Sequence, residues 1–402
     1  MSALAELELD AEPRVNPWIG SIYLDDKPVN LANVLASVTI RHGREDPDGP
    51  IQASTADVKL KGVARSSLVD FEVGHVLTIR GTTADLSNLF QGRLTDATID
   101  DDGGASEAVA SLIAVSPLAD AGGINVGGHA WPAEPWASRV GRILNEAGLW
   151  GAVDAPSPDV PIAATKPSDP ETGAFASLDA LAALEAARDD VGATVWDDGN
   201  GTIIVQAFEA RGGLFPLLEL PPSIVLYSPP WSQTLAGVRN RIVLGYGYGA
   251  GSVTVDDHVS QSIYGVRWTG LFDSGIADQA HALERASEWL NRLAYPKWAL
   301  PGVTLLEPQA LAVGMVVELT ELPDSAPFAT WRAVVEGWVD TIEGPDWTQD
   351  LILSDPQLSG LALPWQELPP ALQWQAVKPT CRWRDAFYLG NLTDLTLTQE
   401  AA

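Results

Sequence analysis

Cysteine and positive charge are both scarce in this sequence of 402 residues. Cys381 is the single cysteine, which excludes an intramolecular disulfide, and with five scattered histidines it cannot complete a zinc site. Only 24 basic side chains stand against 53 acidic ones, so the formal net charge is −29. Binding to a nucleic-acid backbone requires a basic surface, and an anionic lipid surface repels an acidic chain. The charge therefore argues against a nucleic-acid reader and against an anionic-membrane binder.

Long apolar runs are also missing. No segment approaches the roughly 18 apolar residues of a membrane span. Met1–Asp10 lacks the basic and apolar parts of a signal peptide. We therefore expect a protein that is made and folded in a cytoplasm without membrane insertion, cofactor or metal. With 46% apolar and 19% charged residues the chain is globular, and its length indicates about two to four domains.

Glycine and proline are abundant, at 36 and 29 residues, and such frequent turn formers favour many short strands over a helical protein. After an irregular N-terminal arm, residues 1–34, alternating apolar and polar positions predict five half-buried strands. They cover residues 38–42, 56–60, 75–80, 89–99 and 108–115. Because no long helix separates these strands, residues 35–118 are predicted to form a small antiparallel β-barrel.

An Ala-rich α/β unit is predicted at residues 119–232. One helix is expected from Pro135 to Gly148, and a second from Ser177, as N-cap, to a stop at Gly192. The second helix is expected to turn three leucines inward: Leu178, Leu181 and Leu184. A proline-rich extended loop, residues 155–173, joins the helices. A hairpin with strands at residues 193–196 and 202–206 completes the unit.

Strands return in residues 233–356, which are predicted to form a second barrel. They are expected at residues 238–246, 252–255, 303–306, 315–319, 331–342 and 347–353. A helix at residues 276–293 lies between them, within a helical insertion near residues 256–300. A Pro- and Trp-rich C-terminal extension covers residues 357–402. The predicted fold is mainly β, with an α+β insertion, two antiparallel barrels and a lateral α/β domain.

Two distant stretches of the chain contain the same succession of predicted strands, glycines and an acidic turn. The strand after Gly74 leads to a strand with a central Gly92, then to an acidic turn and a further strand. The strand after Gly314 leads in the same way to a strand with a central Gly337, an acidic turn and a further strand. A mid-strand glycine permits a bulge or a close backbone approach. We interpret the echo as a duplicated barrel, with coincidence as the alternative.

The sequence contains no recognisable catalytic, cofactor or metal site. Gly245–Gly251 precedes an alternating strand, so it predicts a hairpin tip and not a nucleotide loop. The acidic turns at residues 46–49, 100–107 and 197–201 lack the ligand spacing of a calcium loop. The histidines lie in separate segments without an obvious acid or nucleophile partner, and we interpret them as structural: His42, His75, His129, His258 and His281.

Several segments together resemble the minor tail proteins of long-tailed bacteriophages of GC-rich, Gram-positive hosts. The likeness begins with Val38–Arg44, Ala53–Leu60, Val73–Ile79 and Leu89–Asp96. It continues with the helix and hairpin of Phe175–Val205, then with Ser228–Leu235 and Val238–Tyr246. Taken in order, these motifs cover about residues 35–355, and each is weak alone. The sequence departs from the family pattern at Lys61–Ser67, where we therefore expect different contacts.

This resemblance implies a baseplate hub or minor tail protein with two tail-tube-like barrels. Such a chain assembles as a homotrimer, a ring that continues the tail tube and leaves a channel for DNA. The implied partners are a distal tail or tail tube protein, the tape measure protein, and tail fibre or receptor-binding proteins. The implied location is the tail tip of the virion, after assembly in the host cytoplasm. DNA would pass without specific binding, and we expect carboxylates along the channel to repel it.

Two other functions stay open at this stage. Tryptophan can stack on sugars, so a glycan-binding tail adhesin is the first alternative. Packing in a core or interface is nevertheless the default for six tryptophans in predicted strands and helices: Trp196, Trp268, Trp289, Trp331, Trp338 and Trp347. A cell-wall polysaccharide hydrolase is the second, because 53 acidic residues leave room for a paired-carboxylate site.

Overall fold

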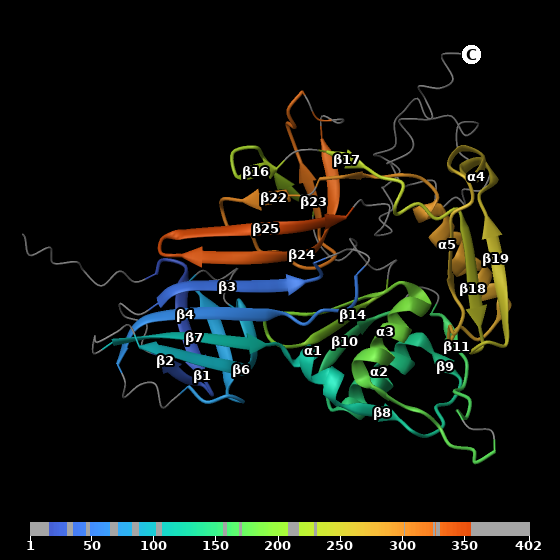
Figure 1. The fold of residues 1–402 in the computed structure, drawn as a ribbon, viewed down its shortest axis with the longest axis horizontal. Coiled ribbons are helices and arrows are strands. Elements are labelled where there is room, and N and C mark those ends of the chain that lie inside the picture. Colours follow the sequence, from blue (N-terminus) through green and yellow to red (C-terminus); the bar gives the residue numbers. More distant parts are fainter. Residues whose placement is uncertain are drawn as a thin grey trace, which may run out of the picture.

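The structure is a computed structural model. It describes residues 16–29, 35–45, 49–64, 71–82, 88–101, 107–155, 159–168, 171–207, 217–228, 231–300, 302–324, 326 and 330–354. The predicted C-terminal extension, residues 357–402, and Cys381 lie outside these ranges. The strands of one large sheet form a ladder from the top to the bottom of the view, and two units that contain helices lie beside this ladder on the right (Figure 1).

The N-terminal part of the ladder has seven strands: β1 (Ile19–Leu24), β2 (Lys27–Val29), β3 (Leu35–Gly43), β4 (Thr55–Ala64), β5 (Val76–Gly81), β6 (Phe90–Asp101) and β7 (Glu107–Val115). Strands β3 to β7 pair antiparallel in the order β3-β4-β7-β6-β5, and we call them the first repeat. Alternate positions such as Val38 and Ile40 are buried, while Arg41 is exposed, as a half-buried strand requires. The five strands predicted here are confirmed.

The N-terminal arm is not wholly irregular, because β1 pairs antiparallel with β5 and β2 with β1. The prediction was wrong for residues 19–29. Ile19 and Ile22 are buried in the core of the first repeat, which favours a strand there. Pro28 lies in β2, at the edge of the sheet, where a missing N–H costs no ladder bond.

Five further strands form what we call the second repeat: β16 (Val225–Ser228), β22 (Gly302–Leu305), β23 (Val316–Leu319), β24 (Trp331–Glu343) and β25 (Asp346–Ser354). They pair antiparallel in the order β16-β22-β25-β24-β23, which is the order of the first repeat, strand for strand. A short strand, β15 (Leu218–Leu220), pairs parallel with β23. The interpretation as a duplication is therefore supported by the topology.

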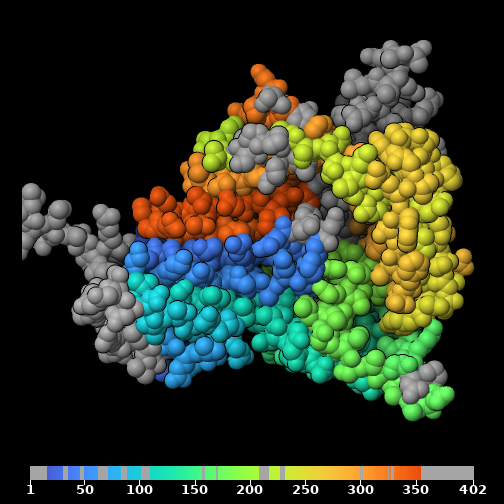
Figure 2. Space-filling view, in the orientation of Figure 1, coloured from blue at the N-terminus to red at the C-terminus, as the bar shows by residue number. Residues whose placement is uncertain are grey.

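The fold is mainly β, as predicted. The two repeats pair through β3 and β24 and so belong to one thirteen-stranded sheet. Among the described residues this sheet does not close into barrels, because its terminal strands β16, β15 and β2 do not pair with one another. In the space-filling view the second repeat lies directly on β3 along the whole junction (Figure 2).

The lateral α/β unit packs two helices against a small sheet of β10 (Gly151–Asp154), β14 (Ile203–Gln206) and β13 (Thr194–Asp197). Helix α2 (Trp136–Ala147) begins after Pro135 and ends at Gly148, as predicted. The unit also contains α1 (Pro117–Asp120), the 3-10 turn η3 (Ala121–Gly123), β8 (Asn125–Gly127), β9 (Glu134–Pro135), β11 (Pro161–Ile162) and β12 (Ser177–Asp179).

Helix α3 (Ala180–Val191) starts later than predicted. Its N-cap is Asp179, whose side chain accepts a bond from the Ala182 N–H, and Ser177 lies in β12 instead. Leu178, predicted to face inward, is exposed because it precedes the helix, whereas Leu184 is fully buried. The stop at Gly192 is confirmed by its φ of 59°.

A third unit lies at the outer end of the molecule (Figure 1). Its sheet consists of β19 (Gly251–Asp256), β18 (Arg241–Tyr246) and β20 (Trp268–Leu271). Helix α5 (Gln279–Leu293) packs on β18 and β19. The unit also contains α4 (His258–Tyr264), β17 (Ser232–Gln233) and β21 (Trp298–Ala299). Although β18 and β19 were predicted in a barrel with β22 to β25, they pair only with each other and β20 in the described part of the chain.

Candidate assembly interface

The junction between the repeats is the place in the main sheet where their two cores meet, and Ile342 and Trp347 of the second repeat pack in the core of the first. Strand β3 pairs antiparallel with the second half of β24, from Gly43 opposite Gly337 to Ser37 opposite Glu343. On its other edge the same half of β24 pairs with β25. On the edge of β24 that faces β3, the first residues, as far as Val334, pair with β23 instead. Two strands therefore share one edge of β24, one after the other.

Glycines permit the backbones to meet where β23 gives way to β3. Gly43 has φ of 71°, and a Cβ there would overlap the Glu336 carbonyl oxygen and the Gly337 Cα atom. A Cβ on Gly337 would in turn overlap the backbone of His42 and Arg44. The Arg44 N–H donates to the Glu336 carbonyl at 3.0 Å. The sequence at both positions is thus fixed by the close approach.

A buried polar cluster lies under the junction. The Asp340 carboxylate accepts bonds from the Trp338 indole at 2.9 Å, the Trp347 indole at 2.8 Å and the Gln349 amide at 2.9 Å. The His42 ring stacks on Trp338 with centroids 4.6 Å apart, and its Nε2 lies 3.6 Å from Asp340. Burial raises the pKa of Asp340 to about 6 and lowers the pKa of His42 to about 4.

A buried ion pair adds a second polar contact to the junction. The Arg44 guanidinium binds the Glu336 carboxylate, and both side chains are buried. The Ser354 hydroxyl donates to the other Glu336 oxygen at 2.6 Å. The members of the pair come from opposite repeats, since Arg44 follows β3 and Glu336 lies in β24. An unpaired charge here would be strongly destabilising, so the pair favours one partner in one register.

The two repeats make the same bend in their third and fourth strands. Gly74 N–H donates to the Leu94 carbonyl at 2.7 Å, and Leu94 N–H returns a bond to His75 at 2.8 Å. In the second repeat Gly314 N–H donates to Val335 at 2.8 Å, and Val335 N–H returns a bond to Met315 at 2.9 Å. Both glycines have positive φ, 101° and 87°. Leu94 and Val335 are therefore equivalent.

This equivalence corrects the glycine match made from the sequence. The next residue in each strand is a bulge, Thr95 in β6 and Glu336 in β24. Gly337 consequently corresponds to Asp96, and not to Gly92. Gly92 serves a different approach, since a Cβ there would overlap the Val115 carbonyl. The order of strands and turns was predicted correctly, but Gly92 and Gly337 permit close approaches to different backbone segments.

Besides the outer edges of β2 and β15, two edges in the described part of the main sheet have no partner strand. Beyond Leu94, β6 pairs with β7 on one side and with no described strand on the other. Strand β16 pairs with β22 on one side only. The two strands lie toward opposite ends of the ladder (Figure 1). Free edges attract further strands, so these are candidate contacts with another chain.

The face of the sheet turned away from the cores is polar. It includes the exposed Ile113, but most of its side chains are hydroxyl groups and charges of both signs, among them Thr39, Arg41, Asp57, Lys59, Asp96, Ser111, Thr341, Glu343 and Asp350. This face does not concentrate the acidic excess of the whole chain. A surface with mixed charges at this density is suited to contact with water.

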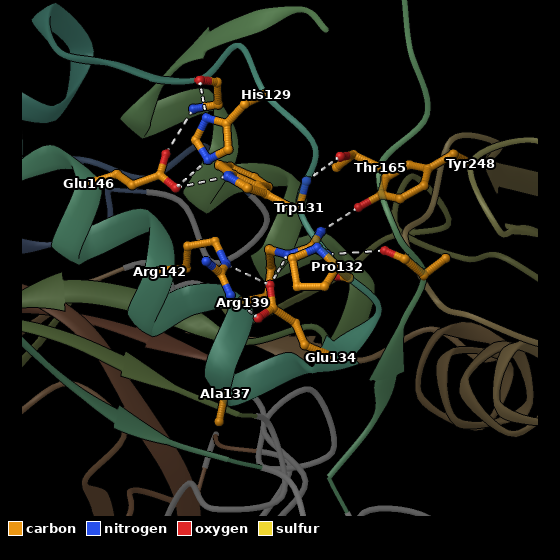
Figure 3. Close-up of polar contacts among 12 residues, drawn as sticks. His129, Trp131, Pro132, Glu134, Ala137, Arg139, Arg142, Glu146, Thr165 and Tyr248 are labelled. Atoms are coloured by element: carbon orange, nitrogen blue, oxygen red, sulfur yellow. Dashed lines mark hydrogen bonds and ion pairs between the residues drawn. The ribbon is translucent and has the colours of Figure 1, made fainter.

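A separate polar network fixes the outer unit to the α/β unit (Figure 3). Glu134 binds the guanidinium groups of Arg139 at 2.8 Å and Arg142 at 2.7 Å, and these bonds hold its pKa below the usual range. Arg139 also donates to the Tyr248 hydroxyl at 2.7 Å, in the turn between β18 and β19. Nearby, Asp190 accepts from the Ser274 hydroxyl at 2.7 Å.

Gly245–Gly251, predicted as a hairpin tip, joins β18 to β19 as such a turn. Four histidines do have a carboxylate neighbour, contrary to the prediction: His42 with Asp340, His75 with Asp25, His129 with Glu146 and His281 with Asp278. These pairings form between segments or around a helix N-cap, which the sequence order alone does not reveal. In the described ranges no three His, Cys, Asp or Glu side chains gather as metal ligands would.

The tryptophans predicted to pack in a core or interface are not all buried. Trp196, Trp331, Trp338 and Trp347 are buried, whereas Trp268 is 60% exposed. Trp150, which was not singled out, is 86% exposed. None of the helices in the described ranges is both long and apolar enough to cross a bilayer.

Solved structures supply the comparison for this fold. The 43 kDa tail protein of prophage MuSo2 from Shewanella oneidensis matches with a TM-score of 0.59 and 10% identity, covering 85% of this chain and 99% of that one. A tail protein from Neisseria meningitidis MC58 matches at 0.60 and 11%, covering 85% and 98%. No protein-family model matches the sequence, and no curated protein sequence does.

A third match is the c3393 protein of E. coli, a type VI secretion component described as structurally similar to the T4 tail proteins gp27 and gp5. Its TM-score is 0.52 at 11% identity, over 84% of this chain and 77% of that one. At such low identity the likeness concerns the fold. The chain therefore has the fold of phage tail proteins.

Proposed function

We propose that this chain is a structural protein of a bacteriophage tail tip, a baseplate hub or minor tail protein. Copies of the chain, three in number, form a ring that continues the tail tube and leaves a channel for DNA. The observation that carries the proposal is the duplicated strand order, joined by β3 and β24 into one sheet. A chain with two equivalent repeats supplies six repeats in a trimer, which suits a sixfold tube.

The remaining assignments follow from the same proposal. The partners are the distal tail or tail tube protein, the tape measure protein, and fibre or receptor-binding proteins. The host class, GC-rich and Gram-positive, rests on the sequence resemblance alone. The chain acts without catalysis or cofactor. The proposed domains have the ranges 1–34, 35–118, 119–232, 233–356 and 357–402, with β1 and β2 added to the sheet of the first repeat and β15 and β16 to that of the second. The α/β and outer units project from the sheet and offer surfaces to those partners.

The acidic excess has a role in this proposal, because carboxylates along a channel repel DNA and keep it from sticking. The polar sheet face with Arg41, Lys59, Asp57 and Asp350 carries both signs. If that face lines the channel, the repelling carboxylates must come from other segments or other chains. Locating the charges in an image of the assembled tail tests this part of the proposal.

The direct test is the native mass of the purified full chain, alone and with its tail partners. A ring of three copies that enters virions is the expected result. A chain that stays monomeric under all these conditions and is missing from particles would contradict the proposal. An image of the virion with the chain labelled would then show whether it occupies the tail tip.

A glycan-binding tail adhesin is the second candidate, and the exposure of Trp150 and Trp268 favours it. Replacement of both by alanine is expected to abolish binding to host cell walls if this function is correct. Binding that survives the double replacement would eliminate these indoles as a sugar platform. A turbidity assay on the same cell walls tests the hydrolase alternative in parallel.

A further inference from the structure

We propose that a second copy of this chain adds its β16 antiparallel to the free half of β6, as β3 adds to β24 within the chain. Repetition of this contact closes the ring. The inference rests on the proposed function, because it identifies the surface through which the ring forms. The inference also goes beyond the proposed function, because it specifies which two strands pair, in which direction and in which register.

The first step is that β6 carries a vacated edge of the same kind as β24. In β24, the positive-φ Gly314 turns β23 away after its bond to Val335, and β3 then takes the edge. In β6, Gly74 turns β5 away after the matching bond to Leu94. The glycine bend that frees part of a strand edge is thus present in both repeats. Within one chain the freed edge of β24 pairs with β3, whereas the freed edge of β6 pairs with no described strand.

The second step is that β16 is the counterpart of β3. Val303 in β22 and Val58 in β4 are equivalent, since they pair with Leu351 and Leu112 at the same place in each repeat. Beyond them, β16 pairs with β22 as β3 pairs with β4. The outer edge of β3 binds β24, whereas the outer edge of β16 binds no described strand.

The third step is the register. Thr39 lies opposite Thr341 in the junction within the chain. Ser228 corresponds to Thr39, because Tyr227 pairs with Val303 as Val38 pairs with Val58. Asp100 corresponds to Thr341, counted along β6 and β24 from Leu94 and Val335. The backbone of Ser228 in one copy is therefore placed directly opposite the backbone of Asp100 in the next.

The contact joins unlike surfaces, β16 of one copy and β6 of the next. Such a heterologous contact produces a closed ring when its rotation closes, and a filament when it does not. The rotation is set by the junction within the chain, since each new contact repeats the step from one repeat to the other. The two edges lie toward opposite ends of the ladder, so each copy can contact one neighbour at each end (Figure 1).

Disulfide formation between copies tests the register. In the full chain carrying Cys381→Ser, we would combine Ser228→Cys with Asp100→Cys. Opposite residues of antiparallel strands have Cα atoms about 4.5–5.5 Å apart, within the range that a disulfide spans. After oxidation, a denaturing gel without reductant should show linked copies that end at three, and reductant should remove them.

Two matched variants control the experiment. Thr39→Cys with Thr341→Cys should close within one chain and leave the copy number unchanged, which shows that the strands and the oxidation are intact. Ser228→Cys with Ile99→Cys moves one cysteine to the neighbouring residue, whose side chain points to the opposite face. It should cross-link at least tenfold less than the Asp100 pair.

The outcomes separate this inference from the proposed function. A ring in native mass without the cross-link, when the Thr39 and Thr341 pair closes normally, would overturn the β16 to β6 contact and leave the tail role standing. Equal cross-linking by the Ile99 control, or a link confined to one chain, would also overturn it. A monomer in native mass that never enters particles would overturn both.

Discussion

The fourth strands of the two repeats have the same neighbours up to their bulge and differ after it. Strand β24 continues between β25 and β3, whereas β6 continues with β7 alone among the described strands. The residues differ accordingly. At the bulge, β24 has the buried Glu336, paired with Arg44, and β6 has the exposed Thr95.

This difference shows where specificity has been added to a duplicated unit. The bend at Gly74 and Gly314 belongs to both repeats, so it is part of the common design. Within the strands of the two repeats and the residue that follows β3, the buried charged or titratable groups lie at the junction: His42, Arg44, Glu336 and Asp340. Buried charges add little net stability but penalise a wrong partner. We infer that the junction is selected for register, and the following experiments test that inference.

Gly43→Ala should cause the largest loss. The added methyl would overlap the Glu336 carbonyl, and the residue would keep a left-handed φ of 71°. We expect the free energy of unfolding to fall by more than about 4 kcal/mol, measured by urea denaturation. Gly141→Ala is the matched control. No atom lies within 4 Å of its Cβ position in helix α2, so it should stabilise the protein by about 1 kcal/mol. A tolerated Gly43→Ala would show that β3 and β24 can separate freely.

Much of the local structure could be predicted from the sequence. The alternation in β3 to β7 and the proline and glycine ends of α2 are local signals, and both gave correct elements. Strand β1 was missed because prolines nearby suggested an irregular arm. Asp25 and Asp26, with φ of 47° and 61°, form the hairpin turn that could have revealed it.

The junction could not be predicted in the same way. Its partners, such as Arg44 and Glu336, are almost 300 positions apart in the chain, and no local period relates them. Strands β15 and β16 join the second repeat from before the outer unit, which separates them from β22 by more than 70 residues. Pairing over such distances depends on burial and edge geometry, which a single sequence does not display.

Glu336→Gln should produce the next largest effect. It leaves the Arg44 guanidinium buried without a full charge partner, which costs roughly 3 kcal/mol. At the equivalent position of the first repeat, Thr95→Ala should change stability by less than about 0.5 kcal/mol, because Thr95 is exposed. Urea denaturation of both variants measures the contrast. Equal effects would mean that the two bulges are used alike.

The pH dependence of stability separates the two buried titratable groups of the junction. The pKa of Asp340 rises from 3.8 to about 6 on folding, so its contribution to stability is present below pH 3.8 and is lost as the pH rises to 6. The pKa of His42 falls from 6.5 to about 4, so its contribution is lost as the pH falls from 6.5 to 4. The two slopes have opposite signs and nearly cancel in the native protein.

Replacing either Asp340 or His42 should reveal how the other group makes the free energy of unfolding depend on pH. In Asp340→Asn, stability should rise between pH 4 and 6 by on the order of 2 kcal/mol relative to the native protein. In His42→Gln it should fall by a similar amount over the same range. Urea denaturation at intervals between pH 4 and 7 measures both slopes. Parallel profiles for the two variants would show that the groups do not titrate as their burial requires.

Ser354→Val should have the smallest effect on stability. It gives the second repeat the residue that the first repeat has at the equivalent position. Ser354 corresponds to Val115, since they pair with Val334 and Arg93 at the same place in each fourth strand. The change removes the 2.6 Å bond to Glu336 and adds one methyl group to a buried site, so Ser354→Ala, which deletes the hydroxyl without adding volume, is the control for packing. Loss of one hydrogen bond to a buried carboxylate should cost about 1–2 kcal/mol in urea denaturation. If the bond serves register, the same change combined with Glu336→Gln should add less than the sum, because both act on one network. Simple addition would instead place Ser354 outside the network that holds β3 against β24.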